Sequence, residues 1–526
     1  MKGKLGILMF GALPNTVKIP VNGYYSADRP LNSSINRRDF LRIAGCCALS
    51  ATIPQAIFAA RKKTEARPNI LFCLADDQSW PHTGDYGDRV INTPNFDRIA
   101  KEGVLFNHTY CAAPSCTPSR SGILTGQHIW RLEQGGQLFG TLPQKYPVYT
   151  DMLSQNGYHV GYMAKGWGPG DVQAGGRTAN PAGDKSYKNF QQFFNAVPAG
   201  KPWCFWFGSR DPHRGYRPGS GVASGMDLEK VEVPPIFPDT PEVRNDICDY
   251  YFEIQRFDRE TGDMLRIIED AGQLENTIVV MTSDNGMPFP RCKATLYDLG
   301  VRMPLAICWK KLIPGGRIVD DFVSLTDLAP TFMEAADVIP PKCMTGKSLL
   351  KILTSPKSGR IEPNRDCVFT ARERHAWCRI EGKGYPSRMI RTKEFLYIRN
   401  YEPDRWPAGT SRMVTNEGQY GDVDASPTKT YMLEHKEDAR GRKLFELAFG
   451  KRPAEELYNC QKDPYQMHNI ADDPAYKEVK KKLSARLTAY LKETGDPRET
   501  GKKVLYDEWP YFGYNKWKVL PEDDKR

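Results

Sequence analysis

Short runs of consecutive apolar residues alternate along the chain with segments in which apolar positions recur at helical spacing. This alternation is typical of an α/β domain, because buried strands are apolar on both faces and their crossover helices on one. Helices are expected at 93–103 and 242–270, with a proline opening the first and glycines following both. Strands are expected at 69–74, 104–110, 158–163, 203–208 and 277–283.

The pattern changes near residue 365, where strand-like segments follow one another without long helices between them. We expect strands at 367–371, 388–392 and 395–400, and an amphipathic helix at 476–494. The chain is therefore predicted to consist of an N-terminal extension (1–66), an α/β domain (67–365) and a smaller α+β domain with an antiparallel sheet (366–526).

Polar residues follow two of the predicted strands at their carboxyl ends. Asp76 and Asp77 come after the first strand, and Asp284 and Asn285 come after the strand at 277–283. Open α/β sheets place their ligands at this edge. A lone Asp-Asp pair is more often a solvated strand end, but two such clusters in matching positions favour a site for a hard divalent cation.

The segment 115–126 places Cys116 at the start of a predicted helix, with Pro118 in its first turn and Gly126 at its end. Free N–H groups and the helix dipole attract anions there, and Arg120 adds a bidentate donor one turn on. These residues leave two alternatives open for Cys116, a nucleophile of low pKa or a structural thiol.

Composition is that of an ordinary globular protein, with 526 residues, 40% hydrophobic and 26% charged. The net charge of +10 suits an anionic substrate but is also common in soluble proteins. No basic block with interleaved aromatic residues is present, so nucleic acid is not an expected partner. The 13 cysteines form no CxxC pair, which argues against a zinc ribbon and a dense disulfide framework.

The N-terminal extension contains Arg37-Arg38, followed by an apolar stretch over residues 43–60. This layout is typical of a twin-arginine export signal and predicts a bacterial protein, periplasmic or extracellular, that engages the export machinery. The alternative is a basic loop that enters a buried helix.

Cys116-x-Pro118-Ser119-Arg120, followed by Leu124-Thr125-Gly126, resembles the type I sulfatase signature. The resemblance implies that a maturation enzyme oxidises Cys116 to formylglycine, whose hydrate attacks the sulfur of a sulfated saccharide. It also implies an alkaline-phosphatase-like fold, with a large mixed central sheet and a smaller C-terminal domain. Further elements follow in the family order, namely Asp76-Asp77, Lys165, Asp211-Pro212-His213, Ser283–Gly286, Lys293, Gly300-x-Arg302-x-Pro304 and Glu456–Asn459.

The same resemblance assigns roles to individual side chains. It implies calcium as the cation, held by Asp76, Asp77, Asp284 and Asn285. Positive charges neutralise the sulfate oxygens and His213 protonates the leaving group, as such displacements require. The expected cations are Lys165, Lys293 and Arg120.

One position departs from the family pattern, because Trp167 stands where many sulfatases carry a histidine that acts as a base. His375 is a candidate replacement. We expect His375, Arg388 and Trp167 to bind substrate, with the run 372–375 and Arg388 gripping a sugar carboxylate or a second sulfate. The alternative for these arginines is a solvated charge run on a strand edge.

Three stretches resemble the sulfamidase branch of the family, which removes N-linked sulfate from the glucosamine of heparan-type glycans. These are residues 211–214, 283–290 and 385–389. Lys293 and Trp167 depart from this branch and favour an exo-acting O-sulfatase on another polysaccharide. A phosphoesterase of the related superfamily and a catalytically lapsed, glycan-binding sulfatase homologue are also compatible with these residues.

Overall fold

The computed structural model describes residues 66–513 and 517–520. Its main feature is a nine-stranded sheet in the order β4-β3-β5-β1-β6-β8-β2-β7, with β9 paired to β2. The strands are β1 Asn69–Ala75, β2 Val104–Tyr110, β3 His159–Ala164, β4 Ser186–Tyr187, β5 Trp203–Gly208, β6 Thr277–Ser283, β7 Arg302–Met303, β8 Leu305–Cys308 and β9 Arg317–Ser324.

The sheet is mixed. Strands β4, β3, β5, β1 and β6 run parallel, whereas β8 is antiparallel to both β6 and β2. Register brings Leu74 of β1 opposite Gly208 of β5, and Ala75 opposite Ser283 of β6. The residues that follow these strands therefore emerge together at one edge of the sheet.

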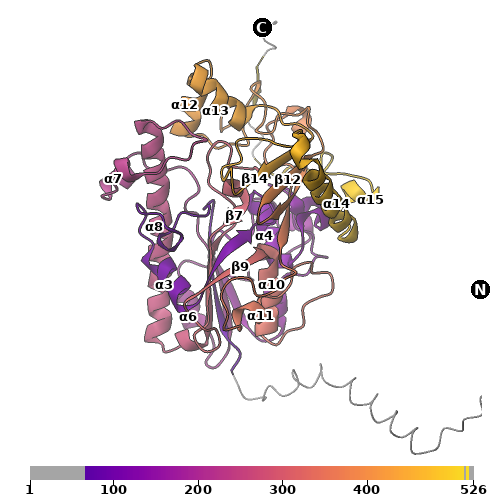
Figure 1. The fold of residues 1–526 in the computed structure, drawn as a ribbon. Helices are drawn as coiled ribbons and strands as arrows, with labels where there is room; N and C mark the ends of the chain where they lie inside the picture. The colour runs from indigo at the N-terminus through magenta and orange to yellow at the C-terminus, as the bar shows by residue number, and fades with distance from the viewer. Residues whose placement is uncertain (1–65, 514–516, 521–526) are drawn as a thin grey trace, which may run out of the picture. The chain divides into compact units, whose positions relative to one another are not determined.

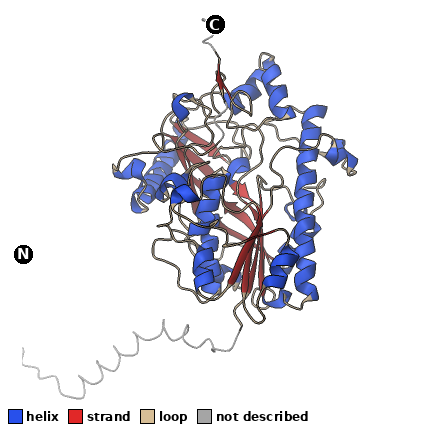
Figure 2. Ribbon diagram, turned by 180° about the vertical axis from the view of Figure 1, so that it is seen from behind, coloured by secondary structure: helices blue, strands red, loops and turns tan. Residues whose placement is uncertain are grey.

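Helices cover both faces of the sheet (Figures 1 and 2). Alternate residues of β1 contact the two helical layers, with Phe72 packed in one hydrophobic cluster and Leu71 in the other. On the Leu71 side lie α3 Pro94–Glu102, α6 Phe190–Ala196 and α8 Pro241–Asp270. On the Phe72 side lie α4 Cys116–Thr125, α5 Tyr149–Gln155 and α10 Leu328–Ala335.

A second, antiparallel sheet has the order β10-β11-β12-β14, over Cys367–Arg372, Ser387–Thr392, Phe395–Asn400 and Glu455–Asn459. Helix α14 (Lys477–Glu493) packs on one face, where Phe369 and Tyr490 stack with ring centroids 3.7 Å apart. The other face joins the core of the main sheet through Val368, Met389 and Ile398. The second sheet is thereby fixed beside the edge from which the acidic strand ends emerge.

Further α-helices and strands lie outside these layers. They are α7 Ser220–Ala223, α9 Asp298–Val301, α11 Leu350–Leu353, α12 Pro427–Glu434, α13 Ala439–Phe449, α15 Pro497–Thr500, β13 Met413–Val414 and β15 Lys518–Val519. Among the helices described, none has the length and apolarity required to cross a membrane.

The predicted fold class is confirmed, with a large mixed sheet and a separate small antiparallel sheet. Each strand and helix predicted from the hydrophobic pattern is present, with ends that differ by no more than a residue or so. The domain boundary near residue 365 stays a prediction. Arg37-Arg38 and the apolar stretch at 43–60 lie outside the described residues.

Candidate active site

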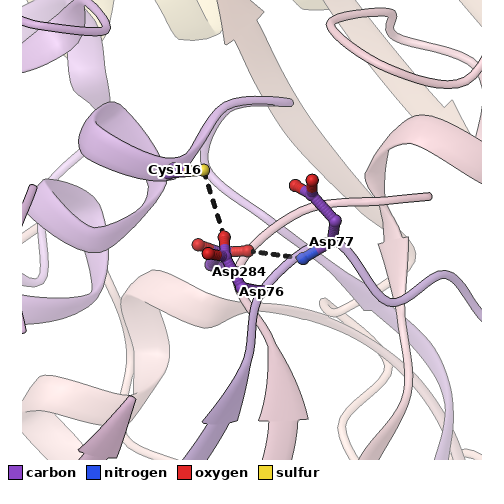
Figure 3. Close-up of side chains that lie close together, drawn as sticks. All are labelled: Asp76, Asp77, Cys116 and Asp284. Carbon is purple, nitrogen blue, oxygen red and sulfur yellow. Dashed lines mark hydrogen bonds between the residues drawn. The ribbon is translucent and has the colours of Figure 1, made fainter. Parts of the chain in front are cut away.

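The carboxyl ends of β1 and β6 bring three aspartates together. Asp284 donates its backbone N–H to Ala75 of the neighbouring strand, and Asp77, with a φ of +80°, turns the chain sharply after β1. Figure 3 shows Asp76, Asp77 and Asp284 converging on Cys116. One ligand atom from each of these four residues lies within 4.8 Å of the other three.

Helix α4 presents Cys116 to this cluster from its first turn, and it ends at Gly126, whose φ of +61° suits glycine. The Cys116 thiol lies 3.2 Å from Oδ1 of Asp76, to which it donates a hydrogen bond (Figure 3). Burial, and then the negative charge of Asp76, raise the pKa of the thiol well above its ordinary value. The unmodified thiol is therefore held in its protonated form in this structure.

Three cations pair with the three aspartates. The Nζ of Lys165 lies 2.5 Å from Asp76, and the Nζ of Lys293 lies 2.5 Å from Asp77. Arg120 Nε lies 2.7 Å from Asp284. Lys165 follows β3. Its backbone N–H donates to the carbonyl oxygen of Gly208, the last residue of the neighbouring strand β5. A Cβ at Gly208 would lie 1.7 Å from the Lys165 carbonyl oxygen, so glycine is required for this approach.

Opposite charges keep Asp76 and Lys293 ionised despite their burial, whereas burial outweighs Arg120 at Asp284 and raises its pKa to about 6. Burial alone would raise the pKa of Asp76, but Lys165, His213 and Arg120 outweigh it and hold that pKa below its usual range. Burial alone would likewise lower the pKa of Lys293, yet the carboxylates of Asp424 and Asp77 hold it well above its ordinary value. The site thus combines fixed positive and negative charges in a water-poor environment, where electrostatic effects are strong.

The donor set fits a hard divalent cation. Asp76, Asp77 and Asp284 offer carboxylate oxygens, and Asn285 Nδ2 donates to Asp77 at 2.6 Å. The Oδ1 of Asn285 is buried and has no hydrogen-bond partner among the described residues. An unsatisfied carbonyl oxygen beside three carboxylates is a suitable ligand for such an ion.

His213 lies at the mouth of the site. Its Nδ1 lies 2.7 Å from the carbonyl oxygen of Arg214, and its Nε2 lies 3.9 Å from Oδ2 of Asp77. Arg214 holds this loop through a bidentate contact with Asp246 at 2.6 and 2.9 Å. The Nε2 atom is thereby left available for proton transfer in the cavity, since the carbonyl fixes Nδ1 as the donor.

A cavity of about 860 Å³, counting its open mouth, connects these groups with the C-terminal part of the chain. The lining residues are Cys116, Leu138, Phe139, Lys165, Pro169, His213, Lys293, His375, Ala376, Trp377, Thr415, Asn416, Glu417, Gly421, Asp424, Tyr511 and Trp517.

His375 lines this cavity as expected, with Nδ1 2.8 Å from the Ser115 hydroxyl oxygen. Burial lowers the pKa of His375 to about 3, so its imidazole is neutral. Trp167 does not line the cavity. It is buried in the main core and donates its indole N–H to the Ser121 hydroxyl at 2.9 Å, holding its loop against α4.

Arg388 does not face the cavity, which corrects the expectation that it grips substrate. Its side chain is fully buried, with Nε 2.5 Å from Asp496 and Nη2 2.7 Å from Glu373. The neighbouring arginines are also committed to internal partners, with Arg372 bonded to Asp422 and Arg391 to Asp298. These arginines stabilise the C-terminal part of the fold and do not bind a substrate anion.

Several cavity residues were not predicted from the sequence. Asp424 and Glu417 come from the polar loop between β13 and α12, and Tyr511 and Trp517 come from the C-terminal tail. Neither segment has a periodic pattern or a recognisable motif. Asp424 contacts Lys293 at 3.6 Å, which ties it to the predicted catalytic group.

Comparison with protein-family models gives two matches. Residues 68–338, more than half of the chain, match the sulfatase model. The chain belongs to the sulfatase family. Residues 292–407 also match a model described as the C-terminal part of N-sulphoglucosamine sulphohydrolase.

Individual relatives are moderately similar. An ulvan-active sulfatase from Formosa agariphila is 29% identical over 82% of this chain and 81% of its own. The N-sulphoglucosamine sulphohydrolase of Homo sapiens is 28% identical over 86% of this chain and 94% of its own.

Solved structures share the fold. One, determined with its substrate D-glucosamine-2-N,6-O-disulfate, has a TM-score of 0.62 at 20% identity, over 84% of this chain and all of its own. The phosphonate monoester hydrolase of Agrobacterium radiobacter has a TM-score of 0.59 at 16% identity, over 82% of this chain and 97% of its own.

The metal assignment predicts a calcium-dependent increase in stability. Calcium at 100 times its Kd should raise the free energy of unfolding by about 2.7 kcal/mol. Asp284→Asn should abolish this increase, because it removes one of three carboxylate ligands. Thermal unfolding with calcium and with chelator measures the effect, and Asp270→Asn, an exposed change at the end of α8, is the control. An unchanged calcium response in Asp284→Asn would contradict the assignment.

The buried pairing of Arg388 predicts a loss of stability on substitution. Arg388→Ala should lower the free energy of unfolding by about 3–5 kcal/mol, because it leaves Glu373 and Asp496 as buried charges with one cation fewer. Denaturant unfolding measures this loss. The KM of the remaining folded enzyme should stay near that of the wild type. A large rise in KM with unchanged stability would restore the substrate-binding role.

Proposed function

We propose that this sulfatase-family hydrolase is an exported enzyme that removes sulfate from N-sulfoglucosamine at a non-reducing end of heparan-type glycans. The observation that carries the proposal is the placement of Cys116 among three aspartates, two lysines and an arginine, in the lining of a cavity that also contains His213. The match of residues 292–407 to the sulphoglucosamine-specific C-terminal model and the human relative favour the N-sulfated substrate.

The chain's own residues supply most of the chemistry in this proposal. Lys165 and Lys293 neutralise the sulfate oxygens, and Arg120 orients Asp284 beside them. With Nδ1–H bonded to the Arg214 carbonyl, His213 would act as the acid in its doubly protonated form, giving the Nε2 proton to the departing nitrogen or oxygen and remaining as the neutral imidazole. Formylglycine formed from Cys116 would supply one hydroxyl to attack sulfur and a second to release sulfate.

Calcium is the proposed ion, because all of its candidate ligands are oxygens. Asp76, Asp77, Asp284 and Asn285 would hold it, and it would add positive charge beside the sulfate. His375, which lines the cavity, is the proposed base in place of the usual histidine, a role that requires an anionic substrate to raise its pKa from about 3. The maturation enzyme and the export machinery are proposed partners, the latter through Arg37-Arg38.

A second candidate is an O-sulfatase that acts on a different sulfated polysaccharide. The ulvan-active relative and the lysine at position 293 favour it. Both candidates use the same cavity and differ in the atom that leaves with the sugar.

Mature protein should carry formylglycine at position 116 and release sulfate from N-sulfoglucosamine. Mass spectrometry of the peptide containing Cys116, together with sulfate release from a panel of N- and O-sulfated saccharides, measures both. Cys116→Ser should form a stable sulfated enzyme without turnover, because a serine sulfate has no second hydroxyl. Full activity of unmodified Cys116 would contradict the mechanism, and release only from O-sulfated sugars would favour the second candidate.

His213→Ala should slow substrates with poor leaving groups by about 10²–10⁴-fold and an activated aryl sulfate far less, because only the former need a proton. Steady-state kinetics with the saccharide and with 4-nitrophenyl sulfate test this. Equal losses on both substrates would show that His213 binds sulfate or supports the fold instead.

A further inference from the structure

The cavity contains a carboxylate that the chemistry above does not use. Asp424 lies between β13 and α12 and lines the same cavity as Cys116, His213 and Lys293. Its side chain is 13% exposed, and its Oδ2 atom is shielded from solvent and accepts no hydrogen bond from the described residues. The distance of 3.6 Å from Oδ2 to Lys293 Nζ exceeds hydrogen-bond length.

A negative charge here needs a reason, because the cavity must accept an anionic group. Part of the reason is Lys293, whose charge is stabilised by Asp77 at 2.5 Å and by Asp424 at 3.6 Å. The exposed part of the Asp424 side chain lines the cavity, and a carboxylate oxygen there can accept a hydrogen bond from a donor that the ligand brings. The geometry therefore points to a hydrogen-bond donor on the ligand.

The surrounding wall suits the body of a sugar and not a second anion. Glu417 lines the same cavity and accepts a hydrogen bond from the backbone N–H of Ala425 at 2.8 Å. Trp377 stacks on Trp517 with centroids 5.5 Å apart, and Tyr511 lies beside Trp377. Aromatic rings pack well against the apolar C–H face of a sugar, and carboxylates accept from its hydroxyl groups.

The arginines of the second sheet reinforce this conclusion. Arg372 and Arg388 bond to buried carboxylates and do not line the cavity. The part of the cavity lining that comes from the C-terminal loop and tail therefore presents acceptors and aromatic rings. A uronate carboxylate or a second sulfate placed against Asp424 would be repelled.

We propose that Asp424 determines specificity by accepting a hydrogen bond from an O–H or N–H group of the sugar unit that carries the sulfate. This deepens the proposed function, since it requires a sulfated sugar as substrate, but it holds for either an N- or an O-linked sulfate. The donor-bearing unit is neutral at the position that faces Asp424.

The test combines Asp424→Asn, which keeps the size of the side chain, with substrates that each lack one donor. These are the best saccharide from the panel, its analogues without one hydroxyl, its counterpart without the N–H, and 4-nitrophenyl sulfate. Asp424→Asn should lower kcat/KM for the saccharide at least tenfold more than for the aryl sulfate. Asp270→Asn, exposed at the end of α8, is the control.

For the analogue that lacks the donor bonded to Asp424, the kcat/KM of the wild type should fall by a similar factor. Asp424→Asn should lower the kcat/KM for that analogue little further, because the same hydrogen bond is already absent. Equal losses on saccharide and aryl sulfate would overturn the proposal and assign Asp424 to the positioning of Lys293. Additive losses on every analogue would also overturn it. A wild-type enzyme that desulfates no saccharide would overturn the proposed function as well, so the two failures are distinguishable.

Discussion

The site depends on three carboxylates held out of water at the edge of the main sheet. Asp76, Asp77 and Asp284 are each buried, and each contacts one of Lys165, Lys293 and Arg120. Removing either member of such a pair leaves an uncompensated buried charge, which is costly. The strand register, the sharp turn at Asp77 and the position of α4 all serve to bring these charges together.

The second sheet completes this arrangement from the other side. It shares the core of the main sheet through Val368 and Met389, so its loops are fixed relative to the strand ends. His375, which follows β10, and Asp424, which follows β13, reach the cavity in this way. Beside Cys116 the cavity is lined by Lys165, Lys293 and His213, and the C-terminal part of the chain adds two carboxylates and three aromatic rings, those of Glu417, Asp424, Trp377, Tyr511 and Trp517.

The sequence predicted the strand ends well because their determinants are local. The apolar runs at 69–74 and 277–283 define strands, and the polar residues after them must emerge at the ligand-binding edge of a parallel sheet. Cys116, Lys165, Lys293 and His213 followed from their motifs and lie together as expected.

The residues placed wrongly, or missed, depend on distant partners. Arg388 is drawn inward by Asp496, 108 residues away, which no local pattern indicates. Trp167 is taken into the core by its contact with Ser121, although a tryptophan in a glycine-rich loop equally suits a sugar platform. Asp424 belongs to a loop without periodicity, and only the fold brings it to Lys293.

The central claim is that sulfate binds between Cys116 and the two lysines. A crystal structure of the Cys116→Ser variant incubated with a sulfated saccharide tests it most directly. The account predicts sulfate bonded to the side-chain oxygen at position 116, its oxygens within hydrogen-bond reach of Lys165 and Lys293, and His213 Nε2 facing the bridging atom. Sulfate bound elsewhere, with position 116 unmodified and both lysines still paired only to aspartates, would contradict it.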